Sequence, residues 1–391
     1  MIRANSIKRL ALLSAIFMLT GCIKSYKIEV GNTLPIDREN EIVEIDLPGK
    51  TVRDGGFIVI DSDGNQIPFQ ISSDGKLLFP ATVKASSSSF YTIRKGSPEK
   101  FDTLCCGSFR ADRMDDFIWE NDRSGYRTYG PALREKGERA FGYDVFTKSI
   151  SRPVMTERFD KAIYGNPKIS FHIDHGDGMD SYGVGPTLGC GADAIVSGDS
   201  LIYPWTWTEY EILENGPIRF KARFSYCPIT VEGKEAIEKR IITLDFGSHM
   251  NKVEVEFEGL EKEYRIAAGV VVHPENHEAY RYGSNADGGY TAYADLGDRN
   301  IGENGEIYVG TVFDTPLLFA GYKPFSKSDL KNRNGAIGHV LGIGTYIPGQ
   351  KYSYFFGSGW SKGGVRDLDS WEAYLKDFLM KSKTPLTINI Q

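Results

Sequence analysis

Apolar and polar side chains alternate along much of this chain. Residues 220–227 and 253–258 each alternate large apolar side chains with charged or small ones. A period of two places successive side chains on opposite faces of a strand, so each segment predicts one buried face and one wet face. The same reading predicts strands at 169–174, 241–246, 265–272, 307–313 and 352–356. In the first of these, His172 is expected to face away from the apolar side.

Turn signals divide the N-terminal part of the chain into short strands. The run Asp61-Ser62-Asp63-Gly64 follows one apolar segment, and Asp74-Gly75 precedes another. Both are typical of tight turns between antiparallel strands. We therefore predict a small N-terminal β domain over residues 23–97 and a larger domain over residues 98–391.

One helix is expected close to the C-terminus. Asp369 and Glu372 resemble a capping box at its start. Its apolar stripe consists of Trp371, Tyr374, Leu375, Phe378 and Leu379. After Pro385, alternation predicts a closing strand. Many amphipathic strands with few helices predict an all-β fold, in which two large antiparallel sheets stack after a small β-sandwich and one helix lies at the C-terminal end.

Residues 1–22 are typical of an export signal. Arg3, Lys8 and Arg9 precede an apolar stretch that is too short to span a bilayer as a mature helix. The stretch ends in Leu19-Thr20-Gly21-Cys22, which resembles a lipobox, so Cys22 is the expected lipidation site. We expect a lipoprotein anchored to a Gram-negative cell envelope, facing the periplasm, with the lipid as its only contact with the membrane.

Composition narrows the classes of partner. The net charge of −6 argues against nucleic acid. No CxxC spacing supports a zinc or redox site, and Cys190 and Cys227 could pair in an oxidising compartment. We expect no cofactor. His172, Asp174, His175 and Asp177 are possible ligands by type, so a divalent cation stays open, although their spacing matches neither a zinc protease nor an EF-hand.

The densest candidate chemistry lies in two short stretches. Trp119, Tyr126, Arg127 and Tyr129 fall within eleven residues, and His172 and His175 follow some forty residues later. Aromatic rings stack on sugar faces, guanidinium groups pair with carboxylates, and imidazoles transfer protons near neutral pH. These residue types predict a site for an anionic sugar. Ordinary core packing and surface ion pairing explain the same residues equally well.

Further candidates lie outside these stretches. His273 ends a buried apolar strand before Pro274, a position where sites are often built. Arg113 and Arg134 are possible additional carboxylate partners. Trp205 and Trp207 are expected to share one face of a strand, either as a platform for a sugar or as part of the core.

The chain resembles the domain of unknown function 4861 family, which occurs in exported bacterial proteins encoded with polysaccharide-degrading enzymes. The residues that carry the resemblance are 116–122, 129–133, 172–178, 185–189 and 356–360. It covers roughly residues 28 to 391. The resemblance implies a galactose-mutarotase-like supersandwich and activity on uronic-acid oligosaccharides. A relative in ulvan breakdown is thought to remove water from a terminal uronate.

These observations lead to an expected reaction. The enzyme would be a carbon–oxygen lyase that eliminates water from the non-reducing-end uronate of an acidic oligosaccharide, giving a 4,5-unsaturated product. Arg127, helped by Arg134 or Arg113, would neutralise the carboxylate, while His172 and His175, or one of them with Tyr129, would act as base and acid, with His273 in reserve. A glycoside hydrolase, a polysaccharide lyase and a non-catalytic glycan-binding lipoprotein are the alternatives.

Overall fold

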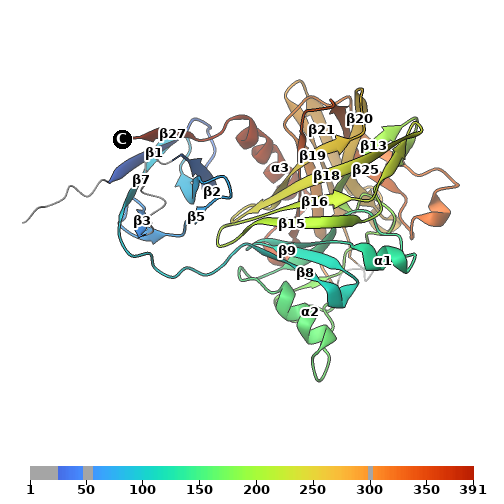
Figure 1. Ribbon diagram of the computed structural model, residues 1–391, viewed down its shortest axis with the longest axis horizontal. Coiled ribbons are helices and arrows are strands. Elements are labelled where there is room, and N and C mark those ends of the chain that lie inside the picture. Colours follow the sequence, from blue (N-terminus) through green and yellow to red (C-terminus); the bar gives the residue numbers. More distant parts are fainter. Residues whose placement is uncertain (1–24, 47–55, 298–302) are drawn as a thin grey trace, which may run out of the picture.

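The structure is a computed structural model that describes residues 25–46, 56–297 and 303–391. Antiparallel strands make up most of it, which confirms the all-β class predicted from the sequence. Figure 1 shows a small group of strands from the N-terminal region lying beside a much larger block of sheets. The predicted signal segment and Cys22 lie outside the described residues.

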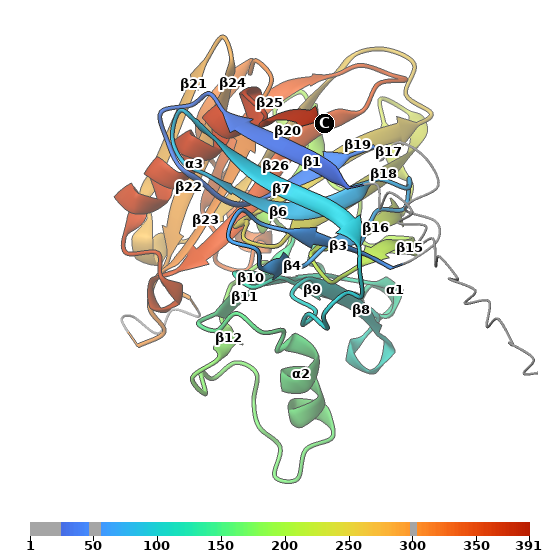
Figure 2. The same ribbon diagram turned by 90° about the vertical axis from the view of Figure 1, so that its left-hand side faces the viewer.

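Two small sheets form the N-terminal part, and Figure 2 shows their strands facing the viewer. One sheet has the order β27 (Thr387–Ile390), β1 (Tyr26–Asn32), β7 (Ser87–Lys95), β3 (Phe57–Ile60) and β4 (Gln66–Ile67). The other has the order β2 (Arg38–Ile45), β6 (Leu77–Val83) and β5 (Gln70–Ile71). Val30, Phe79 and Ile93 are buried in their shared core. The boundary at residue 97 stays a prediction.

The last strand of the chain belongs to this N-terminal part. β27 pairs with β1 in antiparallel register, with Ile390 opposite Ile28. The predicted closing strand is therefore confirmed, and its partner comes from the opposite end of the sequence. Because β27 completes the edge of the sheet, both ends of the described chain meet in one small sandwich (Figure 1).

The large block is built on two facing sheets. The larger one has the order β15 (Trp207–Asn215), β16 (Arg219–Tyr226), β18 (Lys234–Asp245), β19 (Met250–Glu258), β26 (Tyr352–Trp360), β23 (Ile307–Phe313), β22 (Gly288–Asp295) and β21 (Tyr280–Asn285), and β17 (Ile229–Val231) also pairs with β18. The other has the order β14 (Ser200–Ile202), β13 (Cys190–Ser197), β20 (Tyr264–Val272), β25 (Gly338–Tyr346) and β24 (Phe319–Pro324).

The alternating segments explain why these sheets stack. Phe220, Phe224, Val253 and Val255 are fully buried, while the alternate residues Lys221, Arg223 and Glu254 are partly or fully exposed. The same core contains Val270 from the opposite sheet. Burying one such side chain contributes about 1.5–3 kcal/mol, so this two-sided core is a main source of stability. The strands predicted at 241–246, 265–272, 307–313 and 352–356 are confirmed as parts of β18, β20, β23 and β26.

A third sheet packs against the sandwich. Its order is β12 (Gly178–Asp180), β11 (Asp144–Lys148), β10 (Ser124–Thr128), β9 (Asp116–Glu120) and β8 (Cys106–Arg110). The indole nitrogen of Trp119 donates to Asn251 Oδ1 of β19 at 2.8 Å, which ties this sheet to the larger one. The short helices α1 (Pro131–Glu135) and α2 (Met155–Ile163), which the sequence did not predict, accompany it.

The strand predicted at 169–174 is wrong. Residues 171–177 form turns and bends instead. Phe171 is buried against Phe159 of α2, with ring centroids 4.5 Å apart, so a contact with a helix replaces the expected sheet face. His172 is consequently carried on a turn.

The C-terminal helix is confirmed as α3 (Leu368–Lys383), with Trp371 and Leu375 as its buried residues. Its start differs from the prediction. The extended residue Asp367 caps the helix, and its Oδ1 accepts from the Ser370 amide at 2.8 Å. Glu372 bonds instead to the Tyr290 hydroxyl at 2.5 Å, so no capping box forms.

Three remaining features concern the cysteines, the length of the helices and the single 3₁₀ turns. Cys190 and Cys227 are free thiols, so the possible disulfide between them is not present. Among the described residues, no helix combines the length and apolar character that a bilayer crossing requires. Single 3₁₀ turns occur at η2 (Ala111–Arg113), η3 (Pro274–Asn276), η4 (Leu330–Asn332) and η5 (Ser361–Gly363).

Candidate functional site

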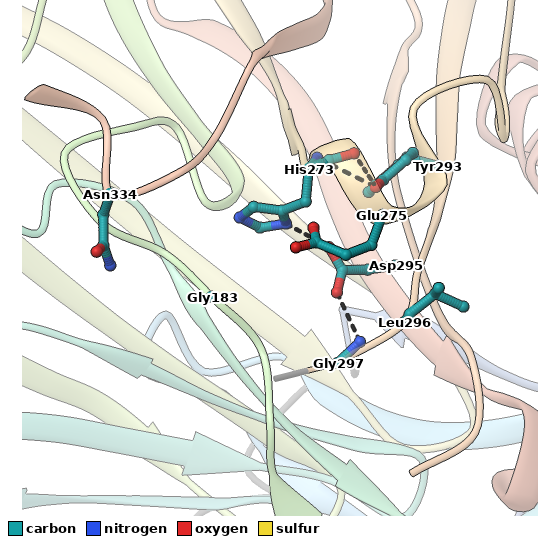
Figure 3. Close-up of a pocket in the computed structure, with 8 residues that line it drawn as sticks. All are labelled: Gly183, His273, Glu275, Tyr293, Asp295, Leu296, Gly297 and Asn334. Atoms are coloured by element: carbon teal, nitrogen blue, oxygen red, sulfur yellow. Dashed lines mark hydrogen bonds and ion pairs between the residues drawn. The ribbon is translucent and has the colours of Figure 1, made fainter. Parts of the chain in front are cut away.

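A cavity of about 280 Å³ opens at one end of the large sandwich, where loops from both sheets meet. His273 follows β20 of one sheet, and Asp295 ends β22 of the other. The side chains and glycines that line the cavity are Gly183, His273, Glu275, Tyr293, Asp295, Leu296, Gly297 and Asn334 (Figure 3). Loops positioned by a rigid scaffold are where binding and catalytic residues concentrate.

His273 and Asp295 form a close pair across the two sheets. The imidazole Nδ1 lies 2.6 Å from Asp295 Oδ2, and the two side chains are 12% and 5% exposed. A carboxylate at this distance accepts a hydrogen bond from Nδ1–H, and this tautomer leaves Nε2 as the basic nitrogen of the ring. The pair therefore has the geometry of an imidazole oriented for proton transfer.

Backbone contacts hold both partners in place. Asp295 Oδ1 accepts from the Gly297 amide at 2.8 Å, so both oxygens of the carboxylate are engaged. Gly297 has a φ of +62°, a conformation that favours glycine. The His273 amide donates to the Tyr293 hydroxyl at 3.1 Å, which fixes the backbone below the ring. Burial raises the pKa of Tyr293, so its phenol keeps its proton at neutral pH.

Gly183 leaves room beside the basic nitrogen. Figure 3 shows the imidazole extending from Asp295 toward the loop that carries Gly183. A β-carbon at this position would lie 3.3 Å from both Cε1 and Nε2 of His273, which is tighter than an ordinary contact. The absence of a side chain there keeps Nε2 open to the cavity.

Another histidine behind the cavity has a different character. His339 is buried, and its Nε2 accepts from the Leu188 amide at 3.1 Å. Burial lowers the pKa of His339 to about 3, so it stays neutral at physiological pH. It is a structural group, and His273 is the imidazole that faces the cavity.

Arg127 is buried and does not line this cavity. Its guanidinium is 7% exposed and contacts Asp116 at 3.4 Å, Asp180 at 3.0 Å and Asp144. Burial alone would lower the pKa of Arg127, but Asp144 and Asp180 raise it, so the charge is retained. With three carboxylates around it, Arg127 is already neutralised. The prediction that it binds a substrate carboxylate is therefore not supported by its placement.

Tyr129 belongs to the same buried cluster. Its hydroxyl donates to Asp144 Oδ2 at 2.9 Å, and the Arg127 guanidinium lies 5.3 Å from its ring centroid. Burial raises the pKa of Tyr129 well above its usual value. A phenol held this way does not act as an acid toward a sugar, and we assign it to the core.

The other two predicted histidines lie on the exterior. His172 Nδ1 contacts the Asp180 carbonyl at 2.8 Å, and its side chain is 51% exposed. His175 is also exposed. His172 Nδ1 also lies 3.9 Å from Asp180 Oδ1, and the Arg127 guanidinium contacts the same carboxylate at 3.0 Å. His172 and Arg127 therefore approach each other through Asp180, with the arginine buried and the histidine exposed, and Asp180 occupies the position predicted for a substrate carboxylate. Arg113 lies nearby, 3.9 Å from Asp116 and over the Phe171 ring.

Three of the predicted sugar-binding rings are core residues. Trp119, Tyr126 and Trp207 are 0%, 0% and 3% exposed. The Tyr126 hydroxyl accepts from the Ser358 amide at 3.0 Å, so even its polar end is used inside the protein. This burial corrects the prediction that a sugar stacks on these rings, because no sugar reaches them.

Arg134 and Trp205 line a separate cavity of about 450 Å³. Trp205 precedes β15 and does not share a strand face with Trp207, contrary to expectation. Its indole nitrogen donates to the Glu138 carbonyl at 3.0 Å. The Arg134 guanidinium contacts the sulfur of Cys227. These two predicted residues are therefore close to each other but are not part of the His273 cavity.

Asp295, Glu275, Tyr293 and Asn334 line the cavity and were not predicted from the sequence. Asp295 ends an apolar strand in the same way as His273, and that shared signal could have found it. Tertiary structure alone brings the two strand ends together. Among the residues that the structure describes, no group of three or more histidine, cysteine or acidic side chains is arranged to hold a metal.

Comparisons with known proteins place the chain in a family. An uncharacterised protein, P7, from Formosa agariphila is 25% identical over 395 residues, covering 93% of each chain. An α-mannosidase from Enterococcus faecalis matches with a TM-score of 0.41 and 10% identity over 94% of this chain and 46% of that one. A glycosyl hydrolase family 38 protein from the same species matches with a TM-score of 0.39 and 10% identity over 94% and 47%. The chain spans about half the length of these two solved structures. The family model for the domain of unknown function DUF4861 matches residues 30–388, so the chain belongs to this family.

Proposed function

We propose that the protein is a carbohydrate-active enzyme that eliminates water from the terminal uronate of an acidic oligosaccharide. One observation supports this most: the imidazole of His273, held by Asp295 at 2.6 Å, presents its second nitrogen to a cavity with room for a sugar ring. His273, the reserve candidate of the sequence, takes the place of His172 and His175.

The proposed reaction starts with His273 Nε2 removing the C5 proton of the uronate. The electron pair of the broken C–H bond forms the C4–C5 double bond, and the C4–O4 bond breaks. O4 leaves as water after it accepts a proton. Asp295 stabilises the imidazolium that forms, because its carboxylate accepts a hydrogen bond from Nδ1–H throughout the reaction and stays ionised.

Glu275 is the proposed acid. It follows His273 by two positions in the same turn and lines the same cavity. A protonated carboxyl there would donate to the departing oxygen. Asn334 also lines the cavity, and its amide would donate a hydrogen bond to the substrate carboxylate, in place of the predicted guanidinium.

A second candidate is hydrolysis of a glycosidic bond. Two carboxylates, Asp295 and Glu275, line the cavity, whereas no lysine or arginine does so among the described residues. Paired carboxylates are the usual groups of glycoside hydrolases. The engagement of both Asp295 oxygens, with His273 and with the Gly297 amide, favours elimination by the imidazole over this alternative.

Product mass distinguishes these reactions. The protein would be incubated with glucuronate-terminated oligosaccharides, and the products would be analysed by mass spectrometry. Elimination gives a product of unchanged length that is lighter by one water. Shorter saturated products would instead show hydrolysis, and shorter unsaturated products would show a polysaccharide lyase. Unchanged oligosaccharide would indicate a protein that binds glycans without catalysis.

A further inference from the structure

A second group of side chains lies beside the 450 Å³ cavity. We call it the arginine–aromatic cluster, and it consists of Arg134, Arg139, Phe141, Tyr203, Trp205 and Arg333. The proposed elimination uses none of these residues. The cluster contains three guanidinium groups, although the whole chain carries a net charge of −6.

The aromatic rings in this cluster form a stack between two cations. Phe141 and Tyr203 are stacked with centroids 5.2 Å apart. The Arg139 guanidinium lies 5.3 Å from the Phe141 centroid, and the Arg333 guanidinium lies 5.5 Å from that of Tyr203. Trp205 stands edge-on to Phe141 at 6.5 Å. Half-buried rings with cations beside them are suited to bind a sugar that carries negative charge.

Arg134 provides the charge of the cavity itself. Its guanidinium contacts the sulfur of Cys227, and in the described part of the chain no carboxylate lies within ion-pair distance of it. It is the one charged side chain that lines this cavity within that part. A half-buried guanidinium with donors left over would gain charge-assisted hydrogen bonds from a carboxylate ligand.

One loop connects the cluster to the His273 cavity. Gly183 lines the His273 cavity, and three residues later the Pro186 carbonyl accepts from Arg333 Nη1 at 2.5 Å. The Phe141 amide donates to the Gly185 carbonyl at 3.4 Å. Asn334, next to Arg333 in sequence, also lines the His273 cavity. Residues 183–186 and 333–334 therefore connect the arginine–aromatic cluster to the lining of the His273 cavity.

We infer that the arginine–aromatic cluster is a second subsite, which binds a further uronate unit of the oligosaccharide whose terminal ring occupies the His273 cavity. This inference rests on the proposed function for its choice of ligand. The Arg134 guanidinium pairs with the uronate carboxylate, and Trp205 contacts the apolar face of the sugar ring, with Tyr203 beside it in the wall of the cavity. Oligosaccharides therefore bind more tightly when the unit beyond the terminal ring is acidic.

The test measures binding and needs no turnover. Isothermal titration calorimetry would compare a glucuronate-containing tetrasaccharide with the same tetrasaccharide after its internal carboxylates are reduced to alcohols. Arg134→Ala should weaken binding of the acidic tetrasaccharide about 10- to 100-fold and leave binding of the reduced one unchanged. Arg223→Ala, which removes an exposed arginine paired with Glu211, is the matched control and should change neither.

Two further variants distinguish the loss of a ligand contact from a general loss of folded protein. Arg134→Lys keeps the charge without the fork and should give an intermediate loss, while Trp205→Ala should weaken binding of both tetrasaccharides. Equal affinity of Arg134→Ala and the unmodified protein for the acidic tetrasaccharide would overturn the subsite. If water elimination is not detected but Arg134→Ala still weakens binding selectively, the proposed reaction fails and the subsite stands.

Discussion

At the scale of single residues, the surroundings of a charged or titratable side chain decide whether it is a structural or a functional group. Arg127 attracted attention in the sequence because it stands between two tyrosines, yet three aspartate side chains surround it inside the protein. His273 was only the reserve candidate among the six histidines of the sequence, yet it faces a cavity. Residue type alone does not distinguish these cases, because an arginine pairs with internal and external carboxylates by the same chemistry.

Asp116 gives a pH-dependent prediction for the Arg127 cluster. Burial raises the pKa of Asp116 to about 7, although Arg127 and Arg113 oppose the rise. The folded state therefore binds more protons than the unfolded state between the ordinary aspartate pKa and pH 7, and stability contributed by protonated Asp116 is lost as pH rises through that window. Asp116→Asn removes this dependence.

Denaturant unfolding at pH 5 and at pH 8 would check this. The difference in free energy of unfolding, Asp116→Asn minus the unmodified protein, should be larger at pH 8 than at pH 5, because only the unmodified protein loses stability as the pH rises. Asp63→Asn, at an exposed turn position, is the control. An identical difference at both pH values for Asp116→Asn would show that the carboxyl is ionised throughout.

Gly183 gives a prediction about access to the basic nitrogen. Gly183→Ala would place a methyl group 3.3 Å from His273 Nε2, where the substrate must approach. Turnover of the oligosaccharide should fall by about tenfold or more, because small displacements of reacting groups cost large factors in rate. The midpoint of thermal unfolding should change little. Full activity of this variant would mean that the substrate approaches His273 from another side.

At the scale of elements, the sequence was informative where one face of a strand is buried. The expected strands agree with β16, β18, β19 and β26 to within one or two residues, or lie inside them. Their alternation is informative because each of these strands has a core on one side and solvent on the other. The segment at 169–174 alternates in the same way but forms turns. Its apolar residues pack against α2 instead of a facing sheet, and period alone cannot reveal which partner is present.

α3 gives a prediction about the packing of an element. Trp371 is fully buried and donates to the Val309 carbonyl at 3.1 Å. Trp371→Ala should lower the free energy of unfolding by about 3–5 kcal/mol, since it leaves a large cavity and an unpaired carbonyl. Met380→Ala, at a residue 41% exposed on the same helix, should change it by less than about 0.5 kcal/mol. Similar losses for both would contradict the packing described for α3.

At the scale of the whole molecule, the topology could not be predicted from local patterns. The alternation near residue 388 predicts a strand, but its pairing with β1 joins residues more than 350 positions apart. The His273–Asp295 pair has the same origin, since each residue ends a strand in a different sheet. The class of fold follows from periodicity, whereas the site depends on contacts between distant strands, which one sequence does not record.

The closing strand gives a prediction at this scale. Deleting residues 386–391 would remove β27 and leave β1 as an edge strand. Amide hydrogen exchange in β1 should become faster, while exchange in β20 and β22 should stay unchanged. Turnover should also be retained, because no residue of the N-terminal sandwich lines the His273 cavity. Loss of protection in β20 would show that the two parts unfold together.

The central claim is that His273 performs the chemistry in the cavity between the two large sheets. The most direct measurement is the rate at which an unsaturated product forms from a glucuronate-terminated oligosaccharide, followed by mass spectrometry, for His273→Ala beside the exposed control His277→Ala. Loss of a general base should reduce the rate about 100- to 10,000-fold in His273→Ala, with His277→Ala unaffected. Equal rates for His273→Ala and the unmodified protein would contradict the claim.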